Sequence, residues 1–409
     1  MATTGPIGPA SYPALLDLPG ARCERVRCGT RTVERYEAEF WTARQRQAHS
    51  LHELSYRACF KPQLPRFFIE RLTDPGDLVY DPFSGRGTTS LEAALLDRRV
   101  AANDVNPLSA LLAAPRLAPP RDTDTVTERL GEYAADPEAR AALDLSMFYH
   151  PATEAALVSL RLALLEQAAA GTEDDLDRWI RMVATNRLTG HSRGFFSVYT
   201  LPPNQAASPS SQVRINARRG QAPPERDVVA LVTRKTGQLL RSLDDETRVR
   251  LQHRARDARF LTGDARATPA IGTGSVRLTV TSPPFLDQVA YAKDNWLRCW
   301  FNGLDSDAVG RTITMARTVP AWTAVMAEVF AELYRVTAPG GHVAFEVGEV
   351  RRGTVPLAEH VVPLGEEAGF ACRAVFINTS RFTKPSHIWG VENHSCGTNT
   401  NRIVLFRKE

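Results

Sequence analysis

Residues 81–89 form a glycine-rich turn that begins with an acidic residue. The stretch Asp-Pro-Phe-Ser-Gly-Arg-Gly-Thr-Thr follows an apolar run and precedes a run of helical character. Gly85 and Gly87 permit close backbone approach to a ligand, and free N–H groups at the start of the next helix suit an anionic carboxylate. Asp81 suits a cationic group, and the turn has no lysine for a nucleotide phosphate. The predicted cofactor-binding residues of this turn are Asp81, Pro82, Phe83, Ser84, Gly85, Gly87, Thr88 and Thr89.

Two further acidic residues follow expected strands. Asp104 comes after residues 99–103, where it can hydrogen-bond a ribose hydroxyl, and Asp264 comes after residues 259–262, where it can accept from an adenine amino group. Asn106 and Ala265 are assigned to the same site. Carboxylate, sulfonium and adenosine together describe S-adenosylmethionine better than NAD. The competing interpretations are an ordinary strand-to-helix turn and an exposed loop aspartate.

Residues 281–285, Thr-Ser-Pro-Pro-Phe, carry the most specific signal. Pro283 and Pro284 fix two φ angles and remove two N–H donors, which leaves a rigid wall of carbonyl oxygens and one hydroxyl. Acceptors such as Ser282 Oγ and the Pro283 carbonyl can grip the N–H bonds of an aromatic amine and favour a pyramidal nitrogen that attacks a methyl group. Phe285 offers a face for a base flipped out of a helix. A plain proline turn is the alternative interpretation.

The elements around these motifs predict an α/β fold. Strands are expected at residues 77–80, 99–103, 259–262, 276–280 and 342–347, with a closing pair at 374–377 and 402–406. The strand at 276–280 alternates polar and apolar residues more than a buried parallel strand should. A helix is expected through residues 88–96, and another with Trp322, Met326 and Leu333 on one face, ended by Pro339-Gly-Gly.

The chain is expected to divide into three parts. Residues 1–75 are an N-terminal tail and a mostly helical segment over 31–75; residues 76–112 and 257–409 form a discontinuous catalytic domain; residues 113–256 are a helical insertion. In the insertion, residues 173–190 are predicted to be a helix capped by Thr172, and residues 200–224 a long loop.

Charge and composition indicate which classes of binding partner and which cellular compartment are favoured. The net charge is +4, yet residues 181–256 contain 14 Lys/Arg and 5 Asp/Glu, a balance that favours a polyanion or a solvated surface. No apolar run is long enough to span a membrane, and the N-terminus is not typical of a signal peptide. The six cysteines contain no Cys-x-x-Cys pair, so no metal is expected and reduced thiols in the cytoplasm are favoured.

The two motifs together resemble those of the DNA amino-methyltransferase family, over roughly residues 40–110 and 257–409. Residues 59–65, Cys-Phe-Lys-Pro-Gln-Leu-Pro, look like the family's N-terminal motif, which implies that Lys61 and Pro62 lie beside the methionine part of the cofactor. The resemblance implies a Rossmann-like seven-stranded sheet with a closing antiparallel hairpin, and a separate target-recognition region. Family members with serine before Pro-Pro are mostly cytosine-N4 enzymes, so Ser282 favours cytosine N4 over adenine N6. The position of the insertion departs from the family's usual motif orders.

By elimination, residues 113–256 are the expected recognition region for double-stranded DNA. Arginine reads guanine, and asparagine reads adenine, in the major groove, whereas other arginines contact phosphates. The candidate DNA-binding residues are Arg187, His191, Arg193, Arg214, Asn216, Arg218 and Arg219. A restriction-modification or epigenetic setting, with a cognate restriction endonuclease or with nucleoid association, fits this interpretation. An RNA methyltransferase and a DNA-binding regulator that has lost catalysis remain the alternatives.

Overall fold

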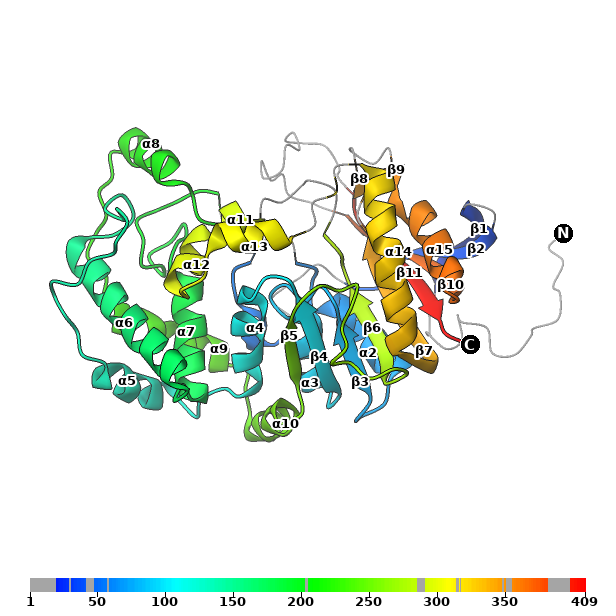
Figure 1. The fold of residues 1–409 in the computed structure, drawn as a ribbon, viewed down its shortest axis with the longest axis horizontal. Coiled ribbons are helices and arrows are strands. Elements are labelled where there is room, and N and C mark those ends of the chain that lie inside the picture. Colours follow the sequence, from blue (N-terminus) through cyan, green and yellow to red (C-terminus); the bar gives the residue numbers. More distant parts are fainter. Residues whose placement is uncertain are drawn as a thin grey trace.

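The computed structural model describes residues 20–28, 31–41, 48–56, 59–202, 205–284, 291–313, 316, 318–347, 349–350, 355–381 and 398–409. Figure 1 shows two parts: a sheet flanked by helices, which ends in the C-terminal strand, and a group of helices, α5 to α9, on the opposite side. No helix among the described residues is both long and apolar enough to cross a membrane.

The sheet has nine strands within the described residues, in the order β1-β2-β10-β11-β7-β6-β3-β4-β5. Strands β7, β6, β3, β4 and β5 are parallel neighbours, and β11 is antiparallel to both β7 and β10. The predicted α/β class and the closing antiparallel pair are therefore confirmed. The strand bounds are Arg22–Cys28 (β1), Arg31–Ala38 (β2), Leu78–Asp81 (β3), Arg99–Asp104 (β4), Arg259–Thr262 (β5), Val276–Thr281 (β6), Thr337–Val347 (β7), Ala371–Arg381 (β10) and Thr398–Arg407 (β11).

The strand order places the two motifs side by side. From β3 the chain moves outward on one side through β4 and β5, and then returns to the other side of β3 through β6 and β7. The point where the order reverses lies between β3 and β6, and ligands of open α/β sheets bind outside the carboxyl ends of the strands at such a point. The glycine turn follows β3 and the Ser-Pro-Pro element follows β6, so both meet there.

The N-terminal part differs from the expected helical segment. Residues 31–38 are strand β2, which forms a hairpin with β1 and pairs in parallel with β10. This hairpin extends the expected seven strands to nine. The prediction of helix was wrong for 31–38, because the buried residues Val33 and Tyr36 are three positions apart, as in a helix, whereas pairing with β1 and β10 makes the segment a strand. Among the described residues of 31–75, helix α2, Gln63–Leu72, and a short 3-10 turn at Ser50–His52 are helical.

Helices around the sheet follow the expectations with small shifts. The predicted helix after the glycine turn is α3, Thr88–Leu95, and the long amphipathic helix is α14, Val319–Val336. The Pro-Gly-Gly stretch lies inside β7 rather than ending α14, and it forms an irregularity in the pairing of β6 with β7. Gly340, with φ of +71°, adopts the left-handed conformation there. Two polar residues of β6, Thr279 and Thr281, are buried, and Thr281 Oγ1 donates to Asp81.

The insertion between β4 and β5 is helical. Its helices are Leu108–Ala113 (α4), Thr123–Glu132 (α5), Pro151–Ala170 (α6), Asp175–Arg187 (α7), Pro209–Arg219 (α8), Val228–Leu240 (α9) and Asp245–Ala255 (α10). Helix α8 corrects the prediction of a long loop over 200–224: Ser208 caps its start, Pro209 occupies the first turn and Gly220 ends it.

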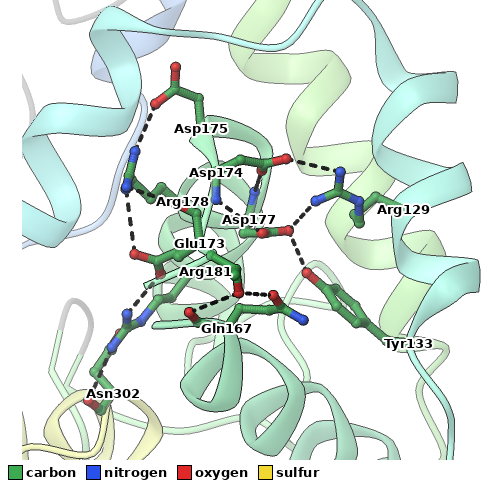
Figure 2. Close-up of polar contacts among 11 residues, drawn as sticks. Arg129, Tyr133, Gln167, Glu173, Asp174, Asp175, Asp177, Arg178, Arg181 and Asn302 are labelled. Atoms are coloured by element: carbon green, nitrogen blue, oxygen red, sulfur yellow. Dashed lines mark hydrogen bonds and ion pairs between the residues drawn. The ribbon is translucent and has the colours of Figure 1, made fainter. Parts of the chain in front are cut away.

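A polar network joins helices α5 and α7 of the insertion to the residue that follows helix α12, Trp296–Phe301 (Figure 2). Asp174, rather than the predicted Thr172, caps α7 in a capping box with Asp177. Arg129 of α5 bonds both aspartates, and Tyr133 donates to Asp177. Arg181 of α7 bonds the side chain and carbonyl of Asn302, the residue that follows α12. The insertion is thereby tied to the segment that follows the Ser-Pro-Pro element.

Candidate active site

A cavity lies at the carboxyl ends of β3, β4, β5 and β6. Its walls combine the glycine turn, the two acidic strand ends, the Ser-Pro-Pro element and one face of α14. The lining residues are Tyr56, Pro82, Phe83, Gly85, Asp104, Val105, Asn106, Gly263, Asp264, Ala265, Ser282, Pro284, Ile313, Ala316, Trp322, Val325, Met326 and Val329. The predicted cofactor and catalytic motifs therefore share one cavity.

The glycine turn is packed from beneath. Gly87 has φ of +73°, and a Cβ at this position would lie 2.4 Å from the Cβ of Ala113 and 2.9 Å from Nη2 of Arg116. The fully buried Arg116 donates to the carbonyls of Arg86 and Gly87 and so fixes the turn. Ser84, Thr88 and Thr89 are buried and do not line the cavity. Pro82, Phe83 and Gly85 of the turn line the cavity, whereas the predicted Gly87 does not.

Asp104 connects the turn to β4. Its Oδ2 accepts from Gly85 N at 2.8 Å and its Oδ1 from Asn106 N at 2.9 Å. Burial raises the pKa of Asp104, while these two backbone donors act in the opposite direction. The Nδ2 atom of Asn106 is buried and has no hydrogen-bond partner among the described residues. Each Asp104 oxygen keeps a further lone pair. Asp104 and Asn106 together therefore offer carboxylate acceptors and one amide donor to a ligand.

Asp81 lies beneath the turn and does not line the cavity. It is 1% exposed, and its Oδ1 accepts from Thr281 Oγ1 at 2.7 Å and from Phe83 N at 3.1 Å. Burial raises the pKa of Asp81 to about 7, against the opposing effect of the Thr281 hydrogen bond. Asp81 thus links the cofactor motif to the residue just before Ser282.

Asp264 and Ala265 line the cavity next to β5. The Asp264 carboxylate is held by Arg266, whose Nη2 lies 2.6 Å from Oδ2 and whose Nε lies 3.0 Å from both oxygens. This arginine lowers the pKa of Asp264. The predicted acceptor is therefore at the cavity but is already engaged by a neighbour.

The Ser-Pro-Pro element forms the far wall. Ser282 and Pro284 line the cavity, whereas Pro283 is buried behind them, and Phe285 lies outside the described residues. Trp322 of α14 donates from Nε1 to the Pro284 carbonyl at 3.0 Å and fixes the end of the element.

Glu346, near the end of β7, lies close enough to Ser282 for a hydrogen bond with the serine hydroxyl to lower the pKa of this carboxyl. Glu346 is 7% exposed, and burial raises its pKa while hydrogen bonds from Ser282 and Asn401 lower it. A serine hydroxyl has a single proton. When Glu346 is ionised and accepts that proton, the Ser282 lone pairs remain available as acceptors.

Lys61 and Pro62 do not line the cavity. Pro62 is buried immediately before α2, and Lys61 is partly buried, with a pKa that burial and the nearby Arg86 lower. The cavity wall on this side is Tyr56. The segment before the predicted motif, and not the motif itself, reaches the cavity.

The candidate DNA-binding residues separate into two groups. Arg187 is buried and stacks on Phe195 at 4.1 Å, Asn216 bonds the Met147 carbonyl, and Arg219 stacks on Tyr199 at 3.9 Å. These three have structural contacts. The other four candidates have exposed side chains and make no such guanidinium stack or amide bond to the backbone within the described residues. They are His191, Arg193, Arg214 and Arg218.

Sequence reasoning missed Tyr56, Trp322 and Glu346. Trp322 was expected only as a core residue of its helix, and Tyr56 lies in a segment without a recognisable pattern. Glu346 is an acidic residue in an otherwise apolar strand, which is a usable signal because such a residue is seldom buried without a partner.

Comparisons with known proteins agree with the sequence motifs. Residues 21–111 match the DNA methylase family. A type II methyltransferase, M.MjaII of Methanocaldococcus jannaschii, is 32% identical over 74 residues, which are 18% of this chain and 14% of that protein. The match thus spans about a seventh of the length of that relative. The resemblance to the DNA amino-methyltransferases is confirmed through this segment.

Solved structures are similar to larger parts of the chain at low TM-scores. A candidate DNA modification methylase from Thermus thermophilus is 25% identical, covers 36% of this chain and 50% of its own, and has a TM-score of 0.21. The rRNA methyltransferase AviRa from Streptomyces viridochromogenes is 14% identical, covers 88% and 89% of the two chains, and has a TM-score of 0.31.

Proposed function

We propose that this chain, a relative of the DNA methylases through residues 21–111, transfers a methyl group from S-adenosylmethionine to the exocyclic N4 amino group of cytosine in DNA. The observation that carries the proposal is the shared cavity. One wall is the glycine turn with Asp104, and the opposite wall is Ser282 and Pro284. A cofactor held by the first wall and an amine held by the second therefore meet within one space.

The first wall suits an adenosine-containing cofactor. Asp104 and Asn106 supply two carboxylate oxygens and an unpartnered amide nitrogen at the end of β4, which match ribose hydroxyls. Trp322, Val325 and Met326 supply an apolar surface for an aromatic ring. When bound, S-adenosylmethionine supplies an electrophilic methyl group on a sulfonium. The chain's own contribution is to bind the cofactor and to orient the amine.

The second wall suits the amine. When Glu346 is ionised and accepts a hydrogen bond from the Ser282 hydroxyl, the serine oxygen is left to accept an N–H of the target amino group. The rigid prolines keep the backbone in place, and Trp322 holds the Pro284 carbonyl. Acceptors on the N–H bonds localise the nitrogen lone pair, which is the electrostatic requirement for attack on a methyl group. A neutral serine at position 282, in place of an acidic residue, supports cytosine N4 over adenine N6.

The DNA partner is proposed to lie over α8 and the turn at His191–Arg193. Helix α8 stands away from the other helices of the insertion (Figure 1) and exposes Arg214 and Arg218 one turn apart. Its base is tied to the segment after the Ser-Pro-Pro element, since Ala206 N donates to the Asp294 carbonyl at 2.9 Å and Trp296 Nε1 to the Ala207 carbonyl at 3.1 Å. A duplex bound at α8 is thus held near the cavity. We propose a restriction-modification or epigenetic setting for this activity.

Transfer of labelled methyl groups tests the proposal. The purified protein is incubated with methyl-labelled S-adenosylmethionine and either duplex DNA or RNA, in parallel with Ser282→Ala. We expect label in DNA with the unsubstituted protein and none with Ser282→Ala, although that variant still binds S-adenosylhomocysteine. Label in RNA alone supports the RNA alternative. Cofactor and DNA binding without label in either polymer supports a regulator that has lost catalysis.

A further inference from the structure

The cavity wall at Tyr56 is held by residues that come from outside the sheet. Tyr56 lines the cavity and is 9% exposed. It faces the glycine turn, because a Cβ at Gly85 would lie 3.8 Å from its Cε1 atom. Residues 53–56 have neither helical nor strand structure. Without a hydrogen-bonded ladder of its own, this segment takes its position from the side chains that bind its backbone.

Asn186 binds the residue next to Tyr56 through a paired contact. Its Oδ1 accepts from Ser55 N at 3.2 Å, and its Nδ2 donates to the Ser55 carbonyl at 2.9 Å. The side-chain amide thus satisfies both backbone groups of Ser55, as a neighbouring strand does. Asn186 is 1% exposed and lies in the last turn of α7, and Arg187 Nη2 also donates to its Oδ1 at 2.7 Å.

Arg298, which lies further along the chain than Asn186, binds the same residue. Its Nη2 donates to the Ser55 carbonyl at 3.0 Å, and its guanidinium lies 5.5 Å from the centre of the Tyr56 ring. Asn295 Oδ1, 2.7 Å from Nη1, orients the arginine. Arg298 belongs to α12, beyond the Ser-Pro-Pro element. On the other side, Arg86 of the glycine turn donates to the Leu54 carbonyl at 2.8 Å.

We infer that Tyr56 contacts the bound cofactor and that Asn186 and Arg298 are positioning residues that act through Ser55. The inference rests on the proposed function and extends it. The helical insertion, besides carrying the DNA-binding candidates, completes the cofactor pocket. Cofactor affinity then depends on a side chain of α7, which the sequence alone assigned to the recognition region.

A double-mutant cycle on cofactor binding tests this inference. The dissociation constant of S-adenosylhomocysteine is measured by calorimetry for the unsubstituted protein, Asn186→Ala, Tyr56→Ala and the double variant. Loss of the paired contact is expected to raise the dissociation constant of Asn186→Ala roughly three- to tenfold, the range of a hydrogen bond's net free energy. The effect is expected to vanish in the Tyr56→Ala background, since Asn186 acts through Tyr56. A residue with only a structural role would weaken binding equally in both backgrounds.

Two variants keep the test decisive. Thr236→Val removes a different buried hydrogen bond of α7, the one from Trp179 Nε1 at 3.1 Å, and is expected to lower the melting temperature without changing the dissociation constant. Asn186→Asp retains the acceptor for Ser55 N and replaces Asn186→Ala in the cycle if that variant does not fold. Its dissociation constant for S-adenosylhomocysteine is expected to rise less than that of Asn186→Ala.

Three results would overturn the inference or its premise. An unchanged dissociation constant in a folded Asn186 variant contradicts it, and so does an equal rise in the Tyr56→Ala background. If the unsubstituted protein does not bind S-adenosylhomocysteine at all, the proposed function fails, and the inference fails with it.

Discussion

Replacement of Glu346 by glutamine reverses the hydrogen bond on which the proposed role of Ser282 depends. In the structure, Asn401 Nδ2 donates to the carboxylate, and a hydrogen bond with Ser282 lowers the pKa of Glu346. A glutamine has one acceptor oxygen and one NH₂ group. With its oxygen on Asn401, its NH₂ group faces Ser282 and turns the serine proton toward the cavity. Ser282 then presents a donor to the target amine, where an acceptor is required.

The size of the effect follows from the burial of this pair. Glu346 is 7% exposed, so its end of the charge-assisted bond with Ser282 is shielded from water, whereas Ser282 is half-buried at the cavity wall. Such bonds contribute about 1.5–3 kcal/mol. With about 1.4 kcal/mol for each tenfold change in rate, kcat is expected to fall roughly ten- to a hundredfold. The dissociation constant of S-adenosylhomocysteine is expected to stay the same, because Glu346 does not line the cavity.

The assay is single-turnover methyl transfer to DNA over a range of pH. Burial raises the pKa of Glu346, and only the ionised carboxylate accepts the serine proton. The rate of the unsubstituted protein should therefore rise with pH through this raised pKa, and the Glu346→Gln variant should lack that rise. Glu332→Gln is the matched control: it is also a buried carboxylate, but it accepts from Thr268 and Arg335. A folded Glu346→Gln variant with a rate within twofold of the unsubstituted protein would refute the reasoning.

Three further predictions concern stability and DNA binding. Burial raises the pKa of Asp81 to about 7 in the folded state. Between about pH 4 and pH 7 the folded state therefore keeps a proton that the unfolded state has lost. The free energy of unfolding falls as the pH rises through this range. Asp81→Asn should therefore stabilise the protein above pH 7, by up to about 4 kcal/mol, and have little effect near pH 4, as measured by urea unfolding; equal effects at both pH values would contradict this. Arg214→Ala should weaken DNA binding and reduce the slope of log K against log salt concentration by about one. Substitution of the exposed Arg121 by alanine should change neither the affinity nor the slope. Equal losses of affinity in both variants would argue against α8 as the DNA contact. Asp177→Ala should lower the free energy of unfolding by about 2 kcal/mol, because it removes the Asp177 half of the α7 capping box and the bond to Arg129. An unchanged urea midpoint would show that the network in Figure 2 contributes little.

Local patterns predicted the strands and turns that hold the two motifs. The glycine turn lies between β3 and α3 as expected, because apolar strands, positive-φ glycines and helix starts are signalled within a few residues. Parallel strands then bring the ends of β3, β4, β5 and β6 to one edge, so Asp104 and Ser282 meet in one cavity.

The residues that sequence reasoning missed are determined by contacts distant in the chain. Tyr56 reaches the cavity because its neighbour Ser55 is held by Asn186, 131 positions further along, and no local pattern records such a pair. Glu346 meets Ser282 only because β7 pairs with β6. Helix α8 was mistaken for a loop because its proline and serines, typical of loops, also cap and begin helices.

Mass spectrometry of nucleosides tests the central claim most directly. Duplex DNA is treated with the protein and S-adenosylmethionine, digested to nucleosides and compared with DNA treated with Ser282→Ala. The account predicts N4-methylcytosine with the unsubstituted protein and none with the variant. Detection of N6-methyladenine would still support a DNA methyltransferase but would contradict the role given to Ser282 in base choice. The absence of any methylated nucleoside in DNA would contradict the account as a whole.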